Sequence, residues 1–367
     1  KKFLITPVLV FIASYILPFV YWPEMLNWPF FINHGWLPYK DIAIVHTPFL
    51  LGFLTVFYNL LGFNTWTLHL VGSLLLAFTT MLVGLLTKKH SSQIIFGLLA
   101  FSLSGNSVWF ESLLAPVLIL LFWAFKDKKF VLAGFLFGIA LLTKQTAGYL
   151  LPLMALPFLK QRPKKLLFFA ISVLIPIIFL YFWLNANNLM TDFWKWGIQF
   201  VFLQTSHTSP ENSYVLLPTI KQTIFVGGLV LIPLILSRNI AFAWMLFSLL
   251  FAVPRFDFFH LVPFAAFFAI SIGTANIKPK YLVLVILICL AFFVALTNSI
   301  LKQDHSFLDK NTLMVAAYVK NNLQNKTVFF LNSYDQIYFL DNIMPAVKPW
   351  VPQLPWYFGF YGDEFLS

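Results

Sequence analysis

Charged residues are scarce in this 367-residue chain, at 10% of the composition, whereas apolar residues make up 60%. An ordinary soluble domain has about 25% charged and about 45–50% apolar residues. A soluble globule could not cover this much apolar side chain with so little polar surface. The composition therefore excludes a soluble enzyme and an intrinsically disordered chain, and it predicts an integral membrane protein.

Cysteine and acidic residues are also few. The single cysteine, Cys289, excludes an intramolecular disulfide and a cysteine-based metal cluster. Thirteen acidic residues stand against 24 Lys and Arg, which gives a formal net charge of +11. A basic chain can bind nucleic acid, but here the basic residues follow the loops of a membrane protein, so no nucleic-acid partner is expected.

Eleven apolar stretches are candidates for membrane-spanning helices, each of which needs about 20 mostly apolar residues. They lie at about 3–21, 66–86, 93–109, 112–125, 130–146, 148–159, 166–184, 219–236, 240–254, 261–276 and 281–298. Lys and Arg accumulate in short cytoplasmic loops. A cytoplasmic N-terminus puts fourteen of the 24 basic residues, but only Asp127 of the thirteen acidic ones, on the inner side. The sequence therefore predicts a plasma-membrane protein with an extracytoplasmic C-terminal tail.

The predicted organisation is an all-α polytopic domain over residues 1–299, with a first outer loop at 22–65, and an extracytoplasmic tail at 300–367. Counting Pro48–Gly62 as a span would invert every later loop, so we interpret it as an outer juxtamembrane helix. In the tail, a helical pattern at 309–323 and a strand at Thr327–Leu331 predict a small α/β module. We expect the first span to be uncleaved, a few N-terminal residues to be missing, and the tail to be incomplete.

The first outer loop concentrates polar residues among apolar ones. It holds two carboxylates, Glu24 and Asp41, together with His34, Lys40 and His46. A carboxylate near the bilayer surface loses hydration, which raises its pKa and makes it a better general base. The alternative is a solvated loop whose charges have no catalytic role.

Three short motifs lie at the predicted outer face. The first reads Gly35-x-x-Pro38-Tyr39-x-Asp41 and is followed by His46-x-Pro48; the second reads Gly134-x-x-x-Gly138-x-x-x-x-Thr143-Lys144; the third reads Arg255-Phe-Asp257-Phe-Phe-His260. In order and sidedness they resemble the GT-C superfamily of polyprenyl-phosphate-sugar-dependent membrane glycosyltransferases. That superfamily includes protein O-mannosyltransferases and lipid A aminoarabinose transferases.

The resemblance implies transfer of a sugar, with inversion, from a polyprenyl-phosphate donor to a hydroxyl of a glycan, lipid or protein acceptor at the outer face. It makes Glu24 or Asp41 the catalytic base and Lys40, Lys144 and Arg255 the ligands of the donor phosphate. Further site candidates are His34, Tyr39, His46, Glu111, Asp257 and His260. No cofactor is required, and a divalent metal is possible but not demanded by any ligand spacing.

Other interpretations of the same residues stay open at this point. Lys144 can be a lysine that reaches for the membrane surface, and Arg255 and Asp257 can pair to stabilise a turn. At the level of function, the alternatives are a transporter or lipid flippase, an outer-face polysaccharide polymerase or ligase, and a non-enzymatic scaffold. A transporter should carry its coupling residues near the bilayer midplane, whereas the acidic residues of this chain avoid the centres of the predicted spans.

Overall fold

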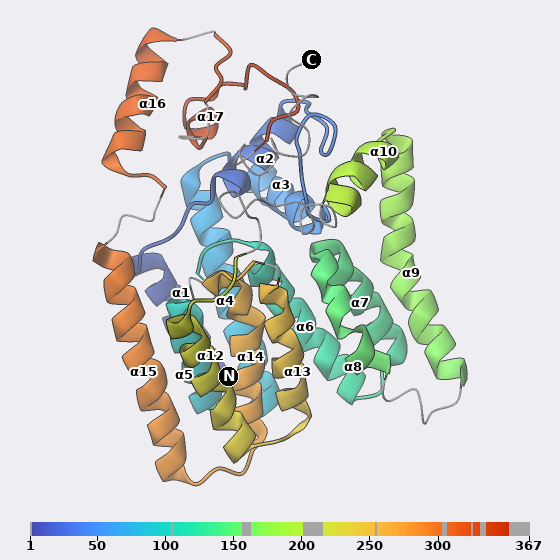
Figure 1. Ribbon diagram of the computed structural model, residues 1–367, viewed down its shortest axis with the longest axis vertical. Coiled ribbons are helices and arrows are strands. Elements are labelled where there is room, and N and C mark those ends of the chain that lie inside the picture. Colours follow the sequence, from blue (N-terminus) through green and yellow to red (C-terminus); the bar gives the residue numbers. More distant parts are fainter. Residues whose placement is uncertain are drawn as a thin grey trace.

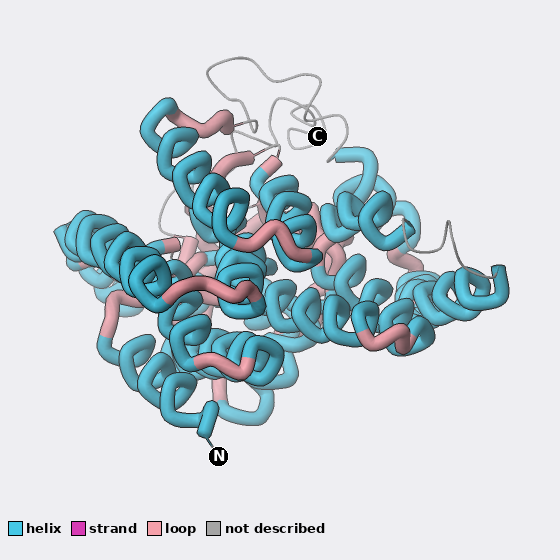
Figure 2. The backbone as a smooth tube through the Cα atoms, turned by 90° about the horizontal axis from the view of Figure 1, so that it is seen from below, coloured by secondary structure: helices cyan, strands magenta, loops and turns pink. Residues whose placement is uncertain are grey.

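The computed structural model describes residues 2–103, 106–155, 163–200, 216–253, 255–302, 307–323, 326–330 and 335–351. Within these ranges the secondary structure consists of helices joined by loops, with no strand (Figure 2). The predicted all-α membrane fold is confirmed to this extent.

A helix lies in at least part of each apolar stretch that the sequence marks as a span. These are α1 (Ile5–Ile16), α4 (Thr65–Thr87), α5 (His90–Ser102), α6 (Phe110–Lys126), α7 (Phe130–Thr143), α8 (Leu151–Ala155, after a 3-10 turn at Gln145–Leu150), α9 (Pro163–Ala186), α12 (Ile220–Leu236), α13 (Ile240–Ser248), α14 (Val262–Thr274) and α15 (Pro279–Lys302). Of the described helices, three are long and apolar enough to cross a membrane: Thr65–Thr87, Lys164–Ala186 and Pro279–Leu296. The count of eleven spans stays a prediction.

Local sequence fixes where several helices begin. Asn64 caps α4 by accepting a hydrogen bond from Thr67 N at 2.8 Å, and Asn239 caps α13 in the same way. Proline opens α9 and α15, where its missing N–H costs no helical hydrogen bond. These caps place the turns between apolar helices at polar residues.

The core lies around α14, in which every residue from Val262 to Gly273 is buried. Helices α9 and α15 lie at the outside of the bundle (Figure 1), and their most apolar windows are only 17% and 11% buried within the protein. An apolar helix with so little protein around it is suited to face lipid.

Helices α7 and α9 approach each other closely through two glycines of the second motif. A Cβ at Gly138 would lie 2.7 Å from the Val173 carbonyl oxygen of α9, and one at Gly134 would meet the Phe169 carbonyl. The prediction that these glycines allow close helix packing is therefore confirmed.

Five helices from the predicted outer segments gather at one end of the bundle (Figure 1). They are α2 (Pro23–Asn33), α3 (Phe49–Leu61), α10 (Met190–Phe193), α16 (Lys310–Asn322) and α17 (Ile337–Leu340). All belong to segments predicted to be outer, and α3 is the helix predicted at Pro48–Gly62. Of the predicted outer segment 185–217, residues 201–215 lie outside the described residues.

The tail differs from the predicted α/β module. The helix expected at 309–323 is present as α16, but the described part of Thr327–Leu331 forms only an isolated bridge from Val328 to Pro345. A strand needs a partner over several residues, and this segment finds one for a single residue. The α/β character is thus not confirmed; of the Pro349–Tyr361 segment, residues 352–361 lie outside the described residues.

Candidate active site

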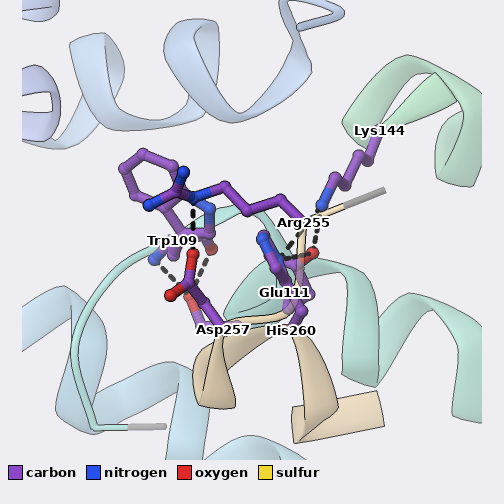
Figure 3. A network of polar contacts seen from close by, with 7 residues as sticks. Trp109, Glu111, Lys144, Arg255, Asp257 and His260 are labelled. Carbon is purple, nitrogen blue, oxygen red and sulfur yellow. Dashed lines mark hydrogen bonds and ion pairs between the residues drawn. The ribbon is translucent and has the colours of Figure 1, made fainter. Parts of the chain in front are cut away.

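A buried polar cluster lies where three elements meet at the end of the bundle that carries the five helices from the predicted outer segments (Figures 1 and 3). Glu111 stands in the first turn of α6, Lys144 directly follows α7, and His260 stands in a 3-10 turn at Phe258–Leu261 that leads into α14. Residues far apart in the sequence thus meet in one cluster.

Glu111 is the centre of this cluster. Its Oε1 accepts a hydrogen bond from Lys144 Nζ and lies 2.6 Å from His260 Nδ1, while Lys144 Nζ and His260 Nδ1 are 3.2 Å apart. The side chains are 0%, 6% and 9% exposed in the order Glu111, Lys144, His260. Glu111 Oε2 has no hydrogen-bond partner among the described residues. The cluster therefore offers a cation, an imidazole and one unused carboxylate oxygen.

His46, from the first motif, lies beside this cluster. Its ring is 4.1 Å from that of Phe110, the residue before Glu111. Burial, followed by the charge of Lys144, lowers the pKa of His46 to about 3, so the imidazole is neutral. Burial also lowers the pKa of His260. Both imidazoles are therefore neutral at pH 7.

Tyr39 and Thr47 hold the segment that carries His46. The Tyr39 hydroxyl, which is buried, donates to the His46 carbonyl at 2.8 Å, and Thr47 Oγ1 donates to the Leu141 carbonyl of α7 at 2.9 Å. Tyr39 has a positive φ of 69°, which is uncommon for a residue other than glycine. The Tyr39 predicted as a site residue therefore positions the loop.

Arg255 and Asp257 form an ion pair at the edge of the cluster (Figure 3), with Arg255 Nε donating to Asp257 Oδ2 at 2.7 Å. Both side chains are about a quarter exposed. The Asp257 carbonyl also accepts a hydrogen bond from His260 N at 3.1 Å. The pair therefore stabilises the turn that presents His260, and it places a guanidinium beside the pocket.

Three aromatic rings connect the cluster to the first outer loop. Trp22, which precedes α2, lies 5.2 Å from Trp109 and 5.1 Å from Phe259, and the latter two rings are 5.4 Å apart. Trp109 and Phe259 are near neighbours in sequence of Glu111 and His260, and Trp22 is near Glu24. The rings thus bring the start of α2 toward the cluster.

Glu24 is the predicted base that the structure buries most deeply. It is 5% exposed, its Oε2 has no hydrogen-bond partner among the described residues, and burial raises its pKa to about 7. Burial, together with the charge of Glu24, raises the pKa of Asp335 to about 7 as well. Asn27 Nδ2 donates to the Asp335 carbonyl at 2.8 Å. A second carboxylate from the tail therefore lies near Glu24.

Both side-chain oxygens of Asp41 contact groups outside the Glu111 cluster. Its Oδ1 is 3.2 Å from Lys348 Nζ, and its Oδ2 accepts a hydrogen bond from Leu37 N at 2.9 Å. Lys40 is exposed, and His34 is exposed with its Nδ1 2.8 Å from the Phe30 carbonyl. The contacts of the described residues connect none of these three to the Glu111 cluster.

A large apolar groove of about 1280 Å³ lies along α7, the helix that Lys144 directly follows. It runs between the first outer loop with α3 on one side and α7 with α9 on the other. Its lining includes Trp36, Leu37, Pro48, Phe53, Leu142 and Trp183. Pro48 and Leu142 are two residues from His46 and Lys144 respectively. The groove has room for a long apolar chain, and α7, which lines it, leads to Lys144.

Metal ligation finds no support in the part of the chain that the structure describes. No group of three or more His, Cys, Asp and Glu side chains there is arranged to hold a metal ion.

The fold matches solved structures of a membrane glycosyltransferase. The apo structure of ArnT from Cupriavidus metallidurans aligns with a TM-score of 0.66 at 12% identity, and the structure of the same protein bound to undecaprenyl phosphate aligns with 0.58 at 13%. Each alignment covers 98% of this chain and 87% of the other. No family model and no curated sequence matches the chain. The resemblance to aminoarabinose transferase-like GT-C proteins is confirmed at the level of the fold.

Several residues near the candidate site were missed by the sequence analysis. Asp335 and Lys348 come from the tail, and their partners Glu24 and Asp41 lie in the first loop. No local spacing relates residues so far apart in the chain. The sequence contains one indication of the aromatic group formed by Trp22, Trp109 and Phe259. Each of these residues lies within two positions of a candidate site residue.

Proposed function

We propose that this chain is a membrane glycosyltransferase that transfers a sugar from a polyprenyl-phosphate donor to an acceptor hydroxyl at the outer face of the membrane. The observation that carries the proposal is the apolar groove along α7, because the same helix leads to Lys144 of the buried Glu111, Lys144 and His260 cluster. A polyprenyl chain suits the groove, and its phosphate suits a buried cation. The likeness in fold to ArnT, one structure of which holds undecaprenyl phosphate, supports this assignment.

Lys144 is the proposed principal ligand of the donor phosphate. Phosphate and Glu111 would then compete for the same ammonium group, with His260 keeping the carboxylate hydrogen-bonded when Lys144 turns to the donor. Arg255, beside the pocket, would add a second cation. Cations of this kind stabilise the charge that develops on a departing phosphate. Lys40 lies outside this arrangement, because its side chain is exposed and its charge acts on Asp192.

Glu24 is the proposed general base. Its pKa of about 7 suits a group that must accept a proton near neutral pH, and one of its oxygens has no partner among the described residues. Asp41 is the weaker candidate, because Leu37 N and Lys348 occupy its oxygens. Glu111 is a third carboxylate to test, although two donors already hold it.

The reaction needs one displacement. The acceptor oxygen attacks the anomeric carbon while its proton moves to Glu24. The bond from that carbon to the phosphate oxygen breaks, and its electron pair leaves with the polyprenyl phosphate. Attack opposite the leaving group inverts the anomeric centre.

Binding of undecaprenyl phosphate to the purified full chain tests the donor site. The double variant Lys144→Gln/Glu111→Gln removes both buried charges together, so it should keep its fold but lose a charge-assisted contact. Such a contact is worth about 1.5–3 kcal/mol, which predicts at least a tenfold weaker affinity. Lys348→Gln/Asp41→Asn removes a different ion pair and should bind normally. Equal affinity in parent and cluster variant would place the phosphate elsewhere.

Transfer itself distinguishes an enzyme from a flippase. With an undecaprenyl-phosphate sugar and membranes that supply acceptors, the parent should release free undecaprenyl phosphate. Glu24→Gln should lower that rate by about 10²–10⁴-fold with donor binding intact. Asp41→Asn and Glu111→Gln, assayed in parallel, identify the base if Glu24→Gln stays active. Binding without any release in the parent would favour the transporter interpretation.

A further inference from the structure

A second pocket, of about 640 Å³, lies at the opposite end of α7 and α9 from the candidate active site. Lys144 follows the last residue of α7, whereas this pocket surrounds the first residues of the same helix. It is lined by Lys128, Lys129 and Lys165, by Ser172, and by the apolar residues Phe130, Val131, Leu132, Phe135, Phe168 and Ile175. Among the described residues, its lining contains no acidic side chain.

The positive end of this pocket is built by two helix starts. Lys128 and Lys129 form the turn before α7, and Lys165 stands in the first turn of α9. Neither first turn contains an acidic residue, and the leading N–H groups of a helix carry partial positive charge. Lys129 lies 4.0 Å from the Trp123 ring and 3.8 Å from Asp127. That ion pair is about half exposed, so it leaves most of the positive potential in place.

The rest of the pocket is an exposed apolar strip. Val131 is 58% exposed, Phe168 55% and Ile175 48%. Phe135 and Ile175 also line the large apolar groove described above, so the strip continues along the seam between α7 and α9. A positively charged end joined to an open apolar strip complements one kind of molecule, an amphiphile with an anionic head and hydrocarbon chains.

We propose that this pocket binds an anionic phospholipid, with its phosphate among Lys128, Lys129 and Lys165 and its acyl chains along Val131, Phe168 and Ile175. Basic pockets between membrane helices on the cytoplasmic side are suited to anionic headgroups, and the loops that carry these lysines are the ones predicted to be cytoplasmic. Its basic end is distinct from the proposed site of the donor phosphate, since Lys129 and Lys144 lie at opposite ends of α7.

Lipid binding to the full chain, measured by native mass spectrometry in detergent, tests the proposal. The probes are dioleoyl phosphatidylglycerol and, as the neutral reference, dioleoyl phosphatidylcholine. The parent should bind phosphatidylglycerol more tightly. Lys128→Gln/Lys165→Gln should weaken phosphatidylglycerol binding about 30-fold, as expected for the loss of two lysine contacts at a membrane surface, without changing phosphatidylcholine binding or the melting temperature.

A matched variant separates a site from general charge attraction. Lys278→Gln/Lys280→Gln removes the same charge from another loop predicted to be cytoplasmic and should bind phosphatidylglycerol like the parent. An equal loss in both double variants would overturn the proposal. Glycerophosphoglycerol, the headgroup without acyl chains, should fail to compete at concentrations at which the lipid saturates. Effective competition would make this a site for soluble phosphates and would overturn the proposal too.

Discussion

Lys144 Nζ donates a hydrogen bond to Glu111 Oε1, and this contact ties the end of α7 to the start of α6. Both side chains are buried, at 6% and 0% exposure, and His260 Nδ1 approaches the same oxygen at 2.6 Å. Charges that have lost their hydration depend on each other, so removal of one leaves the other uncompensated. The pair therefore couples the stability of the bundle to the proposed donor site.

This coupling predicts a strongly non-additive pair of substitutions. Lys144→Met should lower the free energy of unfolding by about 3–5 kcal/mol, because it leaves a buried carboxylate without its cation. Adding Glu111→Gln removes the orphaned charge and should restore a large part of the loss. Thermal unfolding of the purified single and double variants in detergent measures the effect. Losses that simply add would contradict a direct Lys144–Glu111 coupling.

Gly138 is tightly packed between α7 and α9, whereas Gly228 in α12 has free space around it. Gly→Ala should therefore have different effects on stability at these two positions. At Gly138 a Cβ would lie 2.7 Å from the Val173 carbonyl oxygen and 2.9 Å from Pro176 Cγ, so Gly138→Ala should cost about 1–3 kcal/mol. At Gly228 in α12, a Cβ meets nothing within 4 Å. Gly228→Ala should therefore be neutral or stabilise by up to about 1 kcal/mol. Melting temperatures of the two variants test this, and equal shifts would contradict the packing argument.

Helices could be predicted from this sequence because apolar runs are long and turns are marked by residues with clear local preferences. Gly134 and Gly138, four residues apart, share one helix face whatever surrounds them, so close packing there follows from periodicity. The strand predicted at Thr327–Leu331 is not confirmed, because a strand forms only where a partner segment pairs with it over several residues. Within the described part of the chain, this segment pairs only at Val328, with Pro345, and the segment itself does not encode such a partner.

The site was predictable in its residue types but not in its groupings. Glu111, Lys144, His46 and His260 were each marked by a motif or by position, yet they come from four separate segments. Their meeting depends on how helices pack, which local sequence does not specify. Asp41 looked equivalent to Glu24 in the sequence. Its pairing with Lys348 from the tail distinguishes the two, and that contact had no indication in the first loop.

The predicted membrane topology can be tested by labelling introduced cysteines, because the chain's own cysteine should give little background labelling. Cys289 is fully buried, so a membrane-impermeant maleimide should label the parent poorly in intact cells. Lys320→Cys, on α16 in the tail, should be labelled from outside, because an odd number of spans puts the tail there. Lys128→Cys should react only after permeabilisation. The reverse pattern would invert the orientation and contradict the assignment of basic loops to the cytoplasm.

Glu24 and Asp335 predict that stability falls as pH rises. Burial raises the pKa of each carboxyl to about 7, from 4.5 for Glu24 and 3.8 for Asp335. Between these lower values and about pH 7, the folded protein keeps protons that the unfolded chain releases, so raising the pH favours unfolding. The melting temperature should therefore decline from about pH 5 to pH 7 and level off above that. A variant that lacks one of these carboxyl groups tests whether they cause the decline.

Glu24→Gln distinguishes the contribution of Glu24 to this decline from the contributions of the other ionisable groups. The amide has nearly the same shape and no proton to release, so the variant should show a shallower decline of the melting temperature. Asp127→Asn, at a side chain that is 41% exposed, should leave the decline as in the parent. If Glu24 is also the base, the transfer rate of the parent should rise through about pH 7, opposite in sign to stability, because transfer needs the carboxylate that folding disfavours. A slope that is unchanged in Glu24→Gln would contradict the burial of its proton.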